Sequence, residues 1–90
     1  MAHELDSATR RQARTFLLDE ILTELSQTGS PDLQPLLRAL RDPDRVPHRQ
    51  IARWLTNNDH PISNGAVYEY RNRNRLGLWL ALSGVVIEDA

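Results

Sequence analysis

The residues best suited to chemistry in this sequence are arginines, and they are concentrated in one third of the chain. All eleven basic residues are arginine, and the segment 45–75 carries six of them against two acids. The rest of the chain is acidic, so the formal net charge is −1. A guanidinium binds phosphate oxygens through two parallel hydrogen bonds, which suits it to nucleic acids. The charge pattern therefore fits a phosphate-binding surface, and it fits a solvated cationic face equally well.

Other kinds of chemistry lack the residues that they need. The chain has no cysteine, which excludes disulfides and thiolate metal sites. Its histidines, His3, His48 and His60, are far apart, and none pairs with another ligand at helical spacing, so we expect no metal ion and no cofactor. The acids of residues 19–24 are predicted to form a solvated helix face, and the sequence has neither a phosphate loop nor a nucleophile elbow. We expect no enzyme activity and no small-molecule substrate.

The spacing of apolar residues predicts that the arginines are carried on short helices. Four helices are expected, over Ser7 to Ser26, about 33–41, about 47–57, and from Ser63 onward. Asp6 or Ser7 is a suitable cap for the first helix, and Gly29 stands where a left-handed residue would end it. Pro35 must lie in the first turn of the second helix or bend it, and Pro47 suits the first turn of the third.

The last part of the chain, Leu76 to Ile87, has nine apolar residues in twelve. Its apolar spacing predicts a helix, which either extends the fourth helix or follows it as a fifth. An alternative is two short strands around Ser83 and Gly84, which would form the β-hairpin of a winged helix. Ninety residues suit a single domain. The sequence therefore predicts an all-α domain over residues 1–90 with four or five short helices, and a C-terminal β-hairpin wing is the alternative.

The third and fourth helices have the pattern of buried residues that is found in a helix-turn-helix. The first helix of that motif buries a hydrophobic residue, then alanine, then a hydrophobic residue three positions later, as in Ile51, Ala52 and Leu55. The turn closes with a hydrophobic residue and a capping hydroxyl, here Ile62 and Ser63. The second helix buries residues four and seven positions after the cap, here Val67 and Tyr70.

Residues 48–74 therefore resemble the helix-turn-helix DNA-binding proteins, in particular the small regulators and packaging-recognition subunits of phages and mobile elements. The turn from Thr56 to Pro61 departs from the pattern, because it is longer than the tight turn of the simplest members. The resemblance implies sequence-specific binding of double-stranded DNA through about residues 47–75, with the fourth helix in the major groove. It implies a small transcriptional regulator or a phage or plasmid DNA recognition factor.

The same register assigns DNA contacts to the side chains that face outward. The expected DNA-binding residues are Arg49, Arg53, Ser63, Asn64, Gly65, Tyr68, Glu69, Arg71, Asn72, Arg73 and Arg75. Arginines are expected to contact phosphates, and Asn64 is expected to read a base. The alternative function is a protein-interaction adaptor or inhibitor module, whose arginine-rich face meets an acidic partner.

The apolar C-terminal region also bears on assembly. The side chains from Leu76 to Val86 point in too many directions for one neighbouring helix to cover, so we expect this region to contribute to a homodimer interface. The chain has no apolar stretch of about 18 residues, and its first residues lack the basic and then apolar order of a secretory signal. We therefore expect a cytoplasmic protein with no membrane partner.

Overall fold

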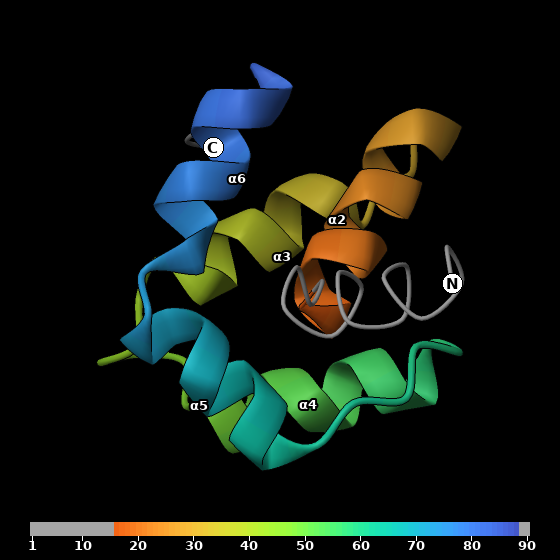
Figure 1. Ribbon diagram of the computed structural model, residues 1–90. Helices are drawn as coiled ribbons and strands as arrows, with labels where there is room; N and C mark the ends of the chain where they lie inside the picture. Colours follow the sequence, from red (N-terminus) through yellow and green to blue (C-terminus); the bar gives the residue numbers. More distant parts are fainter. Residues whose placement is uncertain (1–15, 89–90) are drawn as a thin grey trace, which may run out of the picture.

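The computed structural model describes residues 16–88, and within this range the chain forms five helices and no strand (Figure 1). The helices are α2 (Leu17–Thr28), α3 (Leu33–Leu40), α4 (His48–Asn57), α5 (Asn64–Asn72) and α6 (Arg75–Ser83). The all-α prediction is confirmed. The alternative wing is not found, because residues 75–83 are helical and residues 84–88 form no strand.

The predicted first helix is not continuous from Ser7 to Ser26. Phe16 has an extended backbone, with φ −70° and ψ 139°, and α2 begins at Leu17. The Phe16 ring instead packs edge-on against Tyr70, with 6.1 Å between the ring centroids. The end of the helix is as expected, since Gly29 adopts the left-handed conformation with φ 66°. The expected caps Asp6 and Ser7 lie outside the described residues.

The C-terminal apolar region forms a separate fifth helix. The chain leaves α5 through Asn74, whose backbone is left-handed with φ 54°, a conformation that asparagine adopts more readily than most residues. This reversal turns α6 out of line with α5. Gly84 ends α6 in the same left-handed region, with φ 76°.

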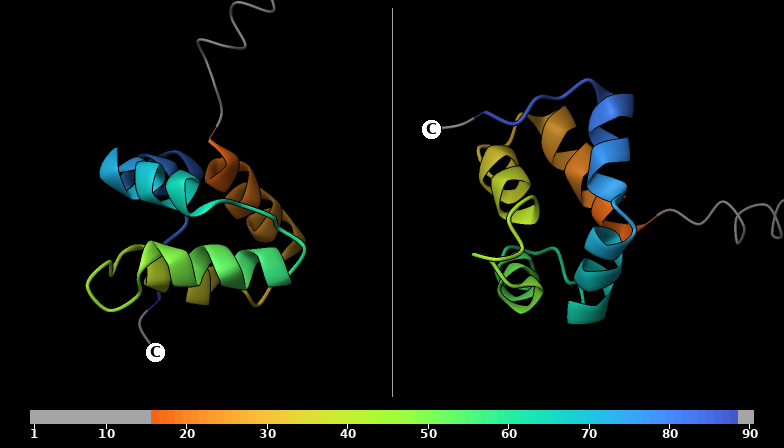
Figure 2. Two further views of the ribbon diagram at one scale, coloured as in Figure 1. Left: turned by 90° about the horizontal axis from the view of Figure 1, so that it is seen from below. Right: turned by 90° about the vertical axis from the view of Figure 1, so that its left-hand side faces the viewer.

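One apolar core joins all five helices. Each helix contributes at least one side chain to a cluster of buried residues: Leu18, Ile21, Leu22, Leu25, Leu36, Leu37, Leu40, Ile51, Ala52, Leu55, Val67, Tyr70 and Trp79. Helices α2 and α5 each pack against three others: α2 contacts α3, α5 and α6, and α5 contacts α2, α4 and α6. Helices α4 and α5 lie together on one side of the molecule, with α2, α3 and α6 on the other (Figures 1 and 2).

The segment after α6 folds back across α3 (Figure 2). The side-chain amide of Gln34 makes two hydrogen bonds to this segment. Its Nε2 donates to the Val86 carbonyl at 2.9 Å, and its Oε1 accepts from the Glu88 N–H at 2.7 Å. Arg38 Nη1 donates to the Glu88 carbonyl at 2.7 Å. The described C-terminal segment is therefore tied to α3 as well as to the end of its own helix, where the Val85 N–H donates to Ser83 Oγ at 3.2 Å.

Candidate nucleic-acid interface

Helices α4 and α5 pack against each other, and the residues that the helix-turn-helix pattern predicts to be buried are buried. Ile51, Ala52 and Leu55 of α4 are at most 3 % exposed, and Val67 and Tyr70 of α5 are fully buried. The small Ala52 side chain lets the two helices approach closely. Helix α5 crosses α4 obliquely at the edge of the molecule (Figures 1 and 2).

The turn between α4 and α5 covers residues 58–63 and is held by local hydrogen bonds. The Thr56 hydroxyl lies 3.4 Å from both the N–H and the carbonyl oxygen of Ile62. The His60 N–H donates to the Leu55 carbonyl at 2.8 Å. Ser63 Oγ accepts from the Ala66 N–H at 3.1 Å, which confirms Ser63 as the cap of α5. This long turn is therefore ordered by its own polar groups.

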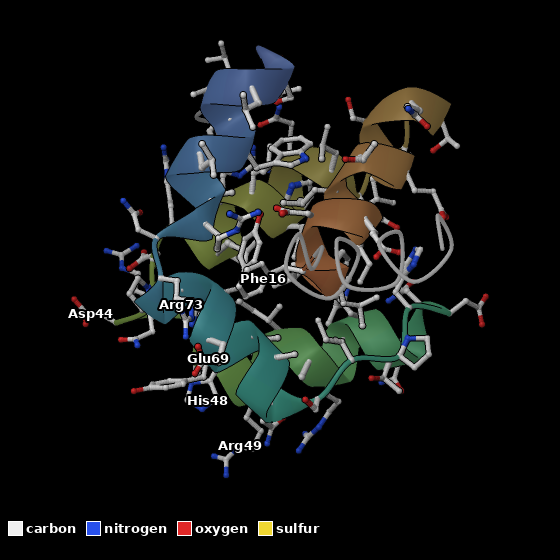
Figure 3. All side chains as sticks on the ribbon, viewed as in Figure 1. Phe16, Asp44, His48, Arg49, Glu69 and Arg73 are labelled. Carbon is white, nitrogen blue, oxygen red and sulfur yellow. The ribbon has the colours of Figure 1, made fainter. Side chains whose placement is uncertain are left out.

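A hollow of about 360 Å³ lies between α4 and the start of α5. Its polar lining comes from Arg49, Arg53, Thr56, Asn57, Ser63 and Asn64. Arg49 and Arg53 are exposed, and among the described residues neither has a hydrogen-bond or ion-pair partner. Figure 3 shows the Arg49 side chain extending away from the body of the protein. This surface therefore combines two unneutralised guanidinium groups with the N–H groups at the positive end of a helix.

The outer face of α5 carries most of the other predicted contact residues. Asn64, Gly65, Tyr68, Glu69, Asn72 and Arg73 are all exposed. Arg73 Nε lies 2.9 Å from Glu69 Oε1, so these two charges largely neutralise each other (Figure 3). The excess positive charge of the α4–α5 face therefore comes mainly from Arg49 and Arg53.

Tyr68 is 51 % exposed but has a defined neighbour. The His48 ring at the start of α4 meets it edge-to-face, with 5.7 Å between the ring centroids. The contact holds the Tyr68 ring against His48 while about half of the residue stays exposed. It also links the start of α4 to the middle of α5.

Arg71 does not belong to this exposed face. Its Nη2 donates to the Ala39 carbonyl at 2.6 Å, and its Nε donates to the Leu40 carbonyl at 3.2 Å. These carbonyls end α3, where a cation is favoured by the helix dipole. Burial lowers the pKa of the Arg71 guanidinium, and the charge of Asp42 opposes that shift. Arg71 therefore joins α5 to α3 instead of pointing to a ligand.

Arg75 also faces inward. Its Nη2 makes an ion pair with Asp19 Oδ2, and its guanidinium carbon lies 4.6 Å from the centre of the Phe16 ring. The hydroxyl of Tyr70 donates to Asp19 Oδ1 at 2.7 Å. Asp19 was predicted to lie on a solvated face, but its side chain is only 14 % exposed. The predicted contact residues thus divide into an exposed group and a pair, Arg71 and Arg75, that bonds within the protein.

Two residues with structural roles were missed in the sequence. Asp19 joins α2 to α5 and α6, and Gln34 holds the C-terminal segment. Both act on residues more than 50 positions away, so no local spacing pattern marks them. The only local signal for Asp19 is that it lies next to Leu18 and three residues before Leu22, both of which are buried.

Neither a metal-binding cluster nor a membrane-spanning helix is found in the part of the chain that the structure describes. Within residues 16–88, no three histidine or acidic side chains come together in an arrangement that could hold a metal ion. No helix in the same range has the length and apolar character needed to cross a membrane. Comparison with protein-family models, with curated proteins and with solved structures finds no match to this chain.

Proposed function

We propose that the protein binds double-stranded DNA through α4 and α5, with α5 entering the major groove. The observation that carries this proposal is the hollow between the two helices, which is lined by the unpaired Arg49 and Arg53 and opens beside the exposed face of α5. The buried side chains of both helices, Ile51, Ala52, Leu55, Val67 and Tyr70, are used in the core. The polar outer face is thus left for a ligand, as in helix-turn-helix proteins.

In this proposal, Arg49 and Arg53 bind phosphates and the start of α5 reads bases. Asn64 is exposed in the first turn of α5, from which an amide reaches the edge of adenine in helix-turn-helix complexes. Gly65 supports a close approach, because a Cβ added there would meet only Ser63 Oγ, at 3.9 Å, and the fold itself does not require glycine at this position. Arg71 and Arg75 are left out of the proposed interface because their guanidinium groups bond to Ala39, Leu40 and Asp19.

The proposed biological role is that of a small transcriptional regulator or a phage or plasmid DNA recognition factor, and it rests on the resemblance of residues 48–74. Such proteins commonly bind paired half-sites as dimers. We propose a homodimer through α6 and the segment after it, where Leu78, Leu82 and Val86 are 46 %, 79 % and 73 % exposed. Leu78 and Leu82 are one helical turn apart, and residues 76–87 carry no charge. An uncharged patch does not repel a second copy of itself across a two-fold axis.

The test is a binding titration with random-sequence duplex DNA at two salt concentrations. The wild-type chain should bind weakly and lose affinity steeply as salt increases, because phosphate contacts release counterions. Changing Arg49 or Arg53 to alanine should weaken binding on all sequences and lower the salt slope by about 1. The matched control is Arg38→Ala, which removes the same charge from α3, outside the proposed interface.

Two results would contradict the proposal. One is the absence of binding at low salt. The other is an equal loss of affinity in all three variants, which would indicate a response to net charge alone rather than to a defined surface.

A further inference from the structure

A second concave surface lies between α3 and α4, and it shares Arg53 and Asn57 with the hollow of the proposed DNA interface. This α3–α4 groove has a volume of about 400 Å³, within the range of ligand-binding pockets. Its apolar lining includes Pro35, Ala39, Val46 and Trp54. None of the exposed residues of α5 lines it. The DNA-binding proposal therefore gives a role to Arg53 but none to the apolar part of this groove.

Trp54 gives the groove the character of a docking site. Its side chain is half-buried, and among the described residues its indole N–H has no hydrogen-bond partner. The other tryptophan, Trp79, is 7 % exposed and donates its indole N–H to Thr23 Oγ1 at 3.1 Å. Tryptophans with an apolar face and a free N–H are enriched at protein interfaces, where they contribute much of the binding energy. Trp54 has these properties and Trp79 does not.

The charges around the groove indicate the chemistry of the occupant. Arg53 lines one edge of the groove. An adjoining hollow shares Pro35, Ala39 and Val46 with the groove and is lined by Arg38 and Arg45. The acid in that hollow, Asp42, forms an ion pair with Arg45 at 3.8 Å, so the uncompensated charge of the rim comes from its other arginines. The apolar floor thus has a positively charged rim, which is complementary to an apolar segment flanked by acids.

We infer that the α3–α4 groove binds an amphipathic helix of a partner protein, with apolar side chains in the groove and acidic side chains against its arginine rim. A groove between two helices accepts a helix through apolar residues at positions i, i+3, i+4 and i+7.

Two other occupants fit the charges less well. Residues 1–15 carry three arginines against two acids, so this chain's own N-terminal segment is positively charged like the rim and is not complementary to it. The exposed leucines of α6 in a second copy have no acids beside them to meet the arginine rim. Their insertion into this groove would also pair two different surfaces of the protein, and such a head-to-tail contact that does not close into a ring produces open-ended filaments. A partner with acidic flanks is therefore favoured.

The inference is tested by NMR titration of the full isotope-labelled chain with a synthetic peptide of about five helical turns. The peptide has leucine at the i, i+3, i+4 and i+7 positions, glutamate on both flanks, and no aromatic residue. We expect saturable shifts of the Trp54 indole and Ala39 amide signals, whereas the Trp79 indole signal should not move. The inference is overturned if no signal shifts at millimolar peptide, or if the shifts centre on α6.

Two matched comparisons test the role of charge. A peptide with lysine in place of glutamate should not bind, and equal binding of both peptides would overturn the inference. Arg53→Glu should weaken binding of the acidic peptide at least tenfold, whereas Arg49→Glu, four residues earlier on α4 and outside the groove, should leave it unchanged. Both substitutions remove proposed phosphate contacts. We therefore expect both variants to lose DNA binding, and only Arg53→Glu to lose peptide binding. This difference allows the two proposals to fail independently of each other.

Discussion

Asp19 accepts hydrogen bonds from two side chains that belong to different helices. Its two carboxylate oxygens bind the Tyr70 hydroxyl of α5 and the Arg75 guanidinium of α6. The Phe16 ring covers both partners, since it meets the Tyr70 ring and the Arg75 guanidinium. The three helices are thus joined at one partly buried polar cluster.

The first prediction concerns Tyr70 at alkaline pH. Burial and the hydrogen bond to Asp19 raise the pKa of Tyr70 far above its usual value of about 10. Above that value the unfolded chain loses the phenolic proton while the folded chain keeps it, so stability is present below about pH 10 and is lost as pH rises further. We expect the free energy of unfolding to fall by about 1.4 kcal/mol per pH unit above pH 10.

Denaturant unfolding between pH 8 and pH 11.5 checks this prediction. The chain has no lysine and no cysteine, so few other side chains titrate in this range. Tyr70→Phe, which cannot ionise, should be less stable at pH 8 but should show a much shallower decline. A decline of equal steepness in both proteins would mean that Tyr70 is not the group responsible.

The second prediction concerns Gly65, where stability and DNA binding should change in opposite directions. Gly65→Ala should stabilise the fold by about 0.5 kcal/mol, because alanine loses less backbone entropy in a helix and a Cβ fits there without a clash. The same methyl group should weaken DNA binding at least about tenfold, or about 1.4 kcal/mol, if the backbone of α5 approaches the DNA closely.

Thermal unfolding and a DNA titration measure the two effects. Gly77→Ala is the matched control, since Gly77 lies in α6 and a Cβ there would meet Asn74 only at ordinary contact distances. It should stabilise the fold in a similar way without affecting DNA binding. If Gly65→Ala also binds DNA like the wild type, Gly65 does not lie at the interface.

At the scale of elements, α3 organises the molecule although it has only eight residues. Its buried face contributes Leu36, Leu37 and Leu40 to the core. Its C-terminal carbonyls accept hydrogen bonds from Arg71, and its outer face holds the C-terminal segment through Gln34. Helix α3 thus positions both the end of α5 and the end of the described chain.

The third prediction is that Gln34→Ala releases the C-terminal segment without unfolding the helices. The substitution removes two hydrogen bonds, and each is worth about 0.5–1.5 kcal/mol. Because both lie at the surface, we expect a loss of about 1 kcal/mol in total. Hydrogen exchange should show faster exchange of the Glu88 amide with unchanged protection in α2. Gln27→Ala, at an exposed position of α2, is the control, and equal exchange of Glu88 in both variants would contradict this role.

At the scale of the whole molecule, the apolar C-terminal region is divided between core and surface. Trp79, expected at a dimer interface, is buried in the chain's own core. Leu76, Leu80, Val85 and Ile87 are partly buried against that core. Only the outward side chains of α6 and Val86 are left for a second copy, so the proposed interface is narrower than the sequence indicated.

The fourth prediction is that Leu82→Glu converts a dimer into a folded monomer. Leu82 is 79 % exposed, so the glutamate should not disturb the monomer, whereas two such charges facing each other across a two-fold axis should separate the copies. Sedimentation velocity at micromolar concentration measures the result, and circular dichroism checks the fold. Leu17→Glu, at another exposed leucine, should leave the dimer intact. A monomeric wild-type chain would refute the homodimer.

The sequence by itself determined the helices and their buried faces. Apolar spacing predicted the core residues of α4 and α5, and Gly29 and Ser63 marked a helix end and a helix start correctly. These features depend on residues at most a few positions apart, because helical periodicity and capping are local interactions. Such signals are present in the chain before it folds.

Only the tertiary structure decided which arginines are available to a ligand. Arg49, Arg53, Arg71 and Arg75 look equivalent in the sequence, yet the last two bond to groups 31 to 56 positions away. Partners at such separations are brought together by the order and crossing of the helices, which no local pattern encodes. The predicted C-terminal helix ends at Ser83 rather than at Ile87. Residues 84–88 instead contact α3, and the sequence could not show this because their bonds to Gln34 span more than 50 residues.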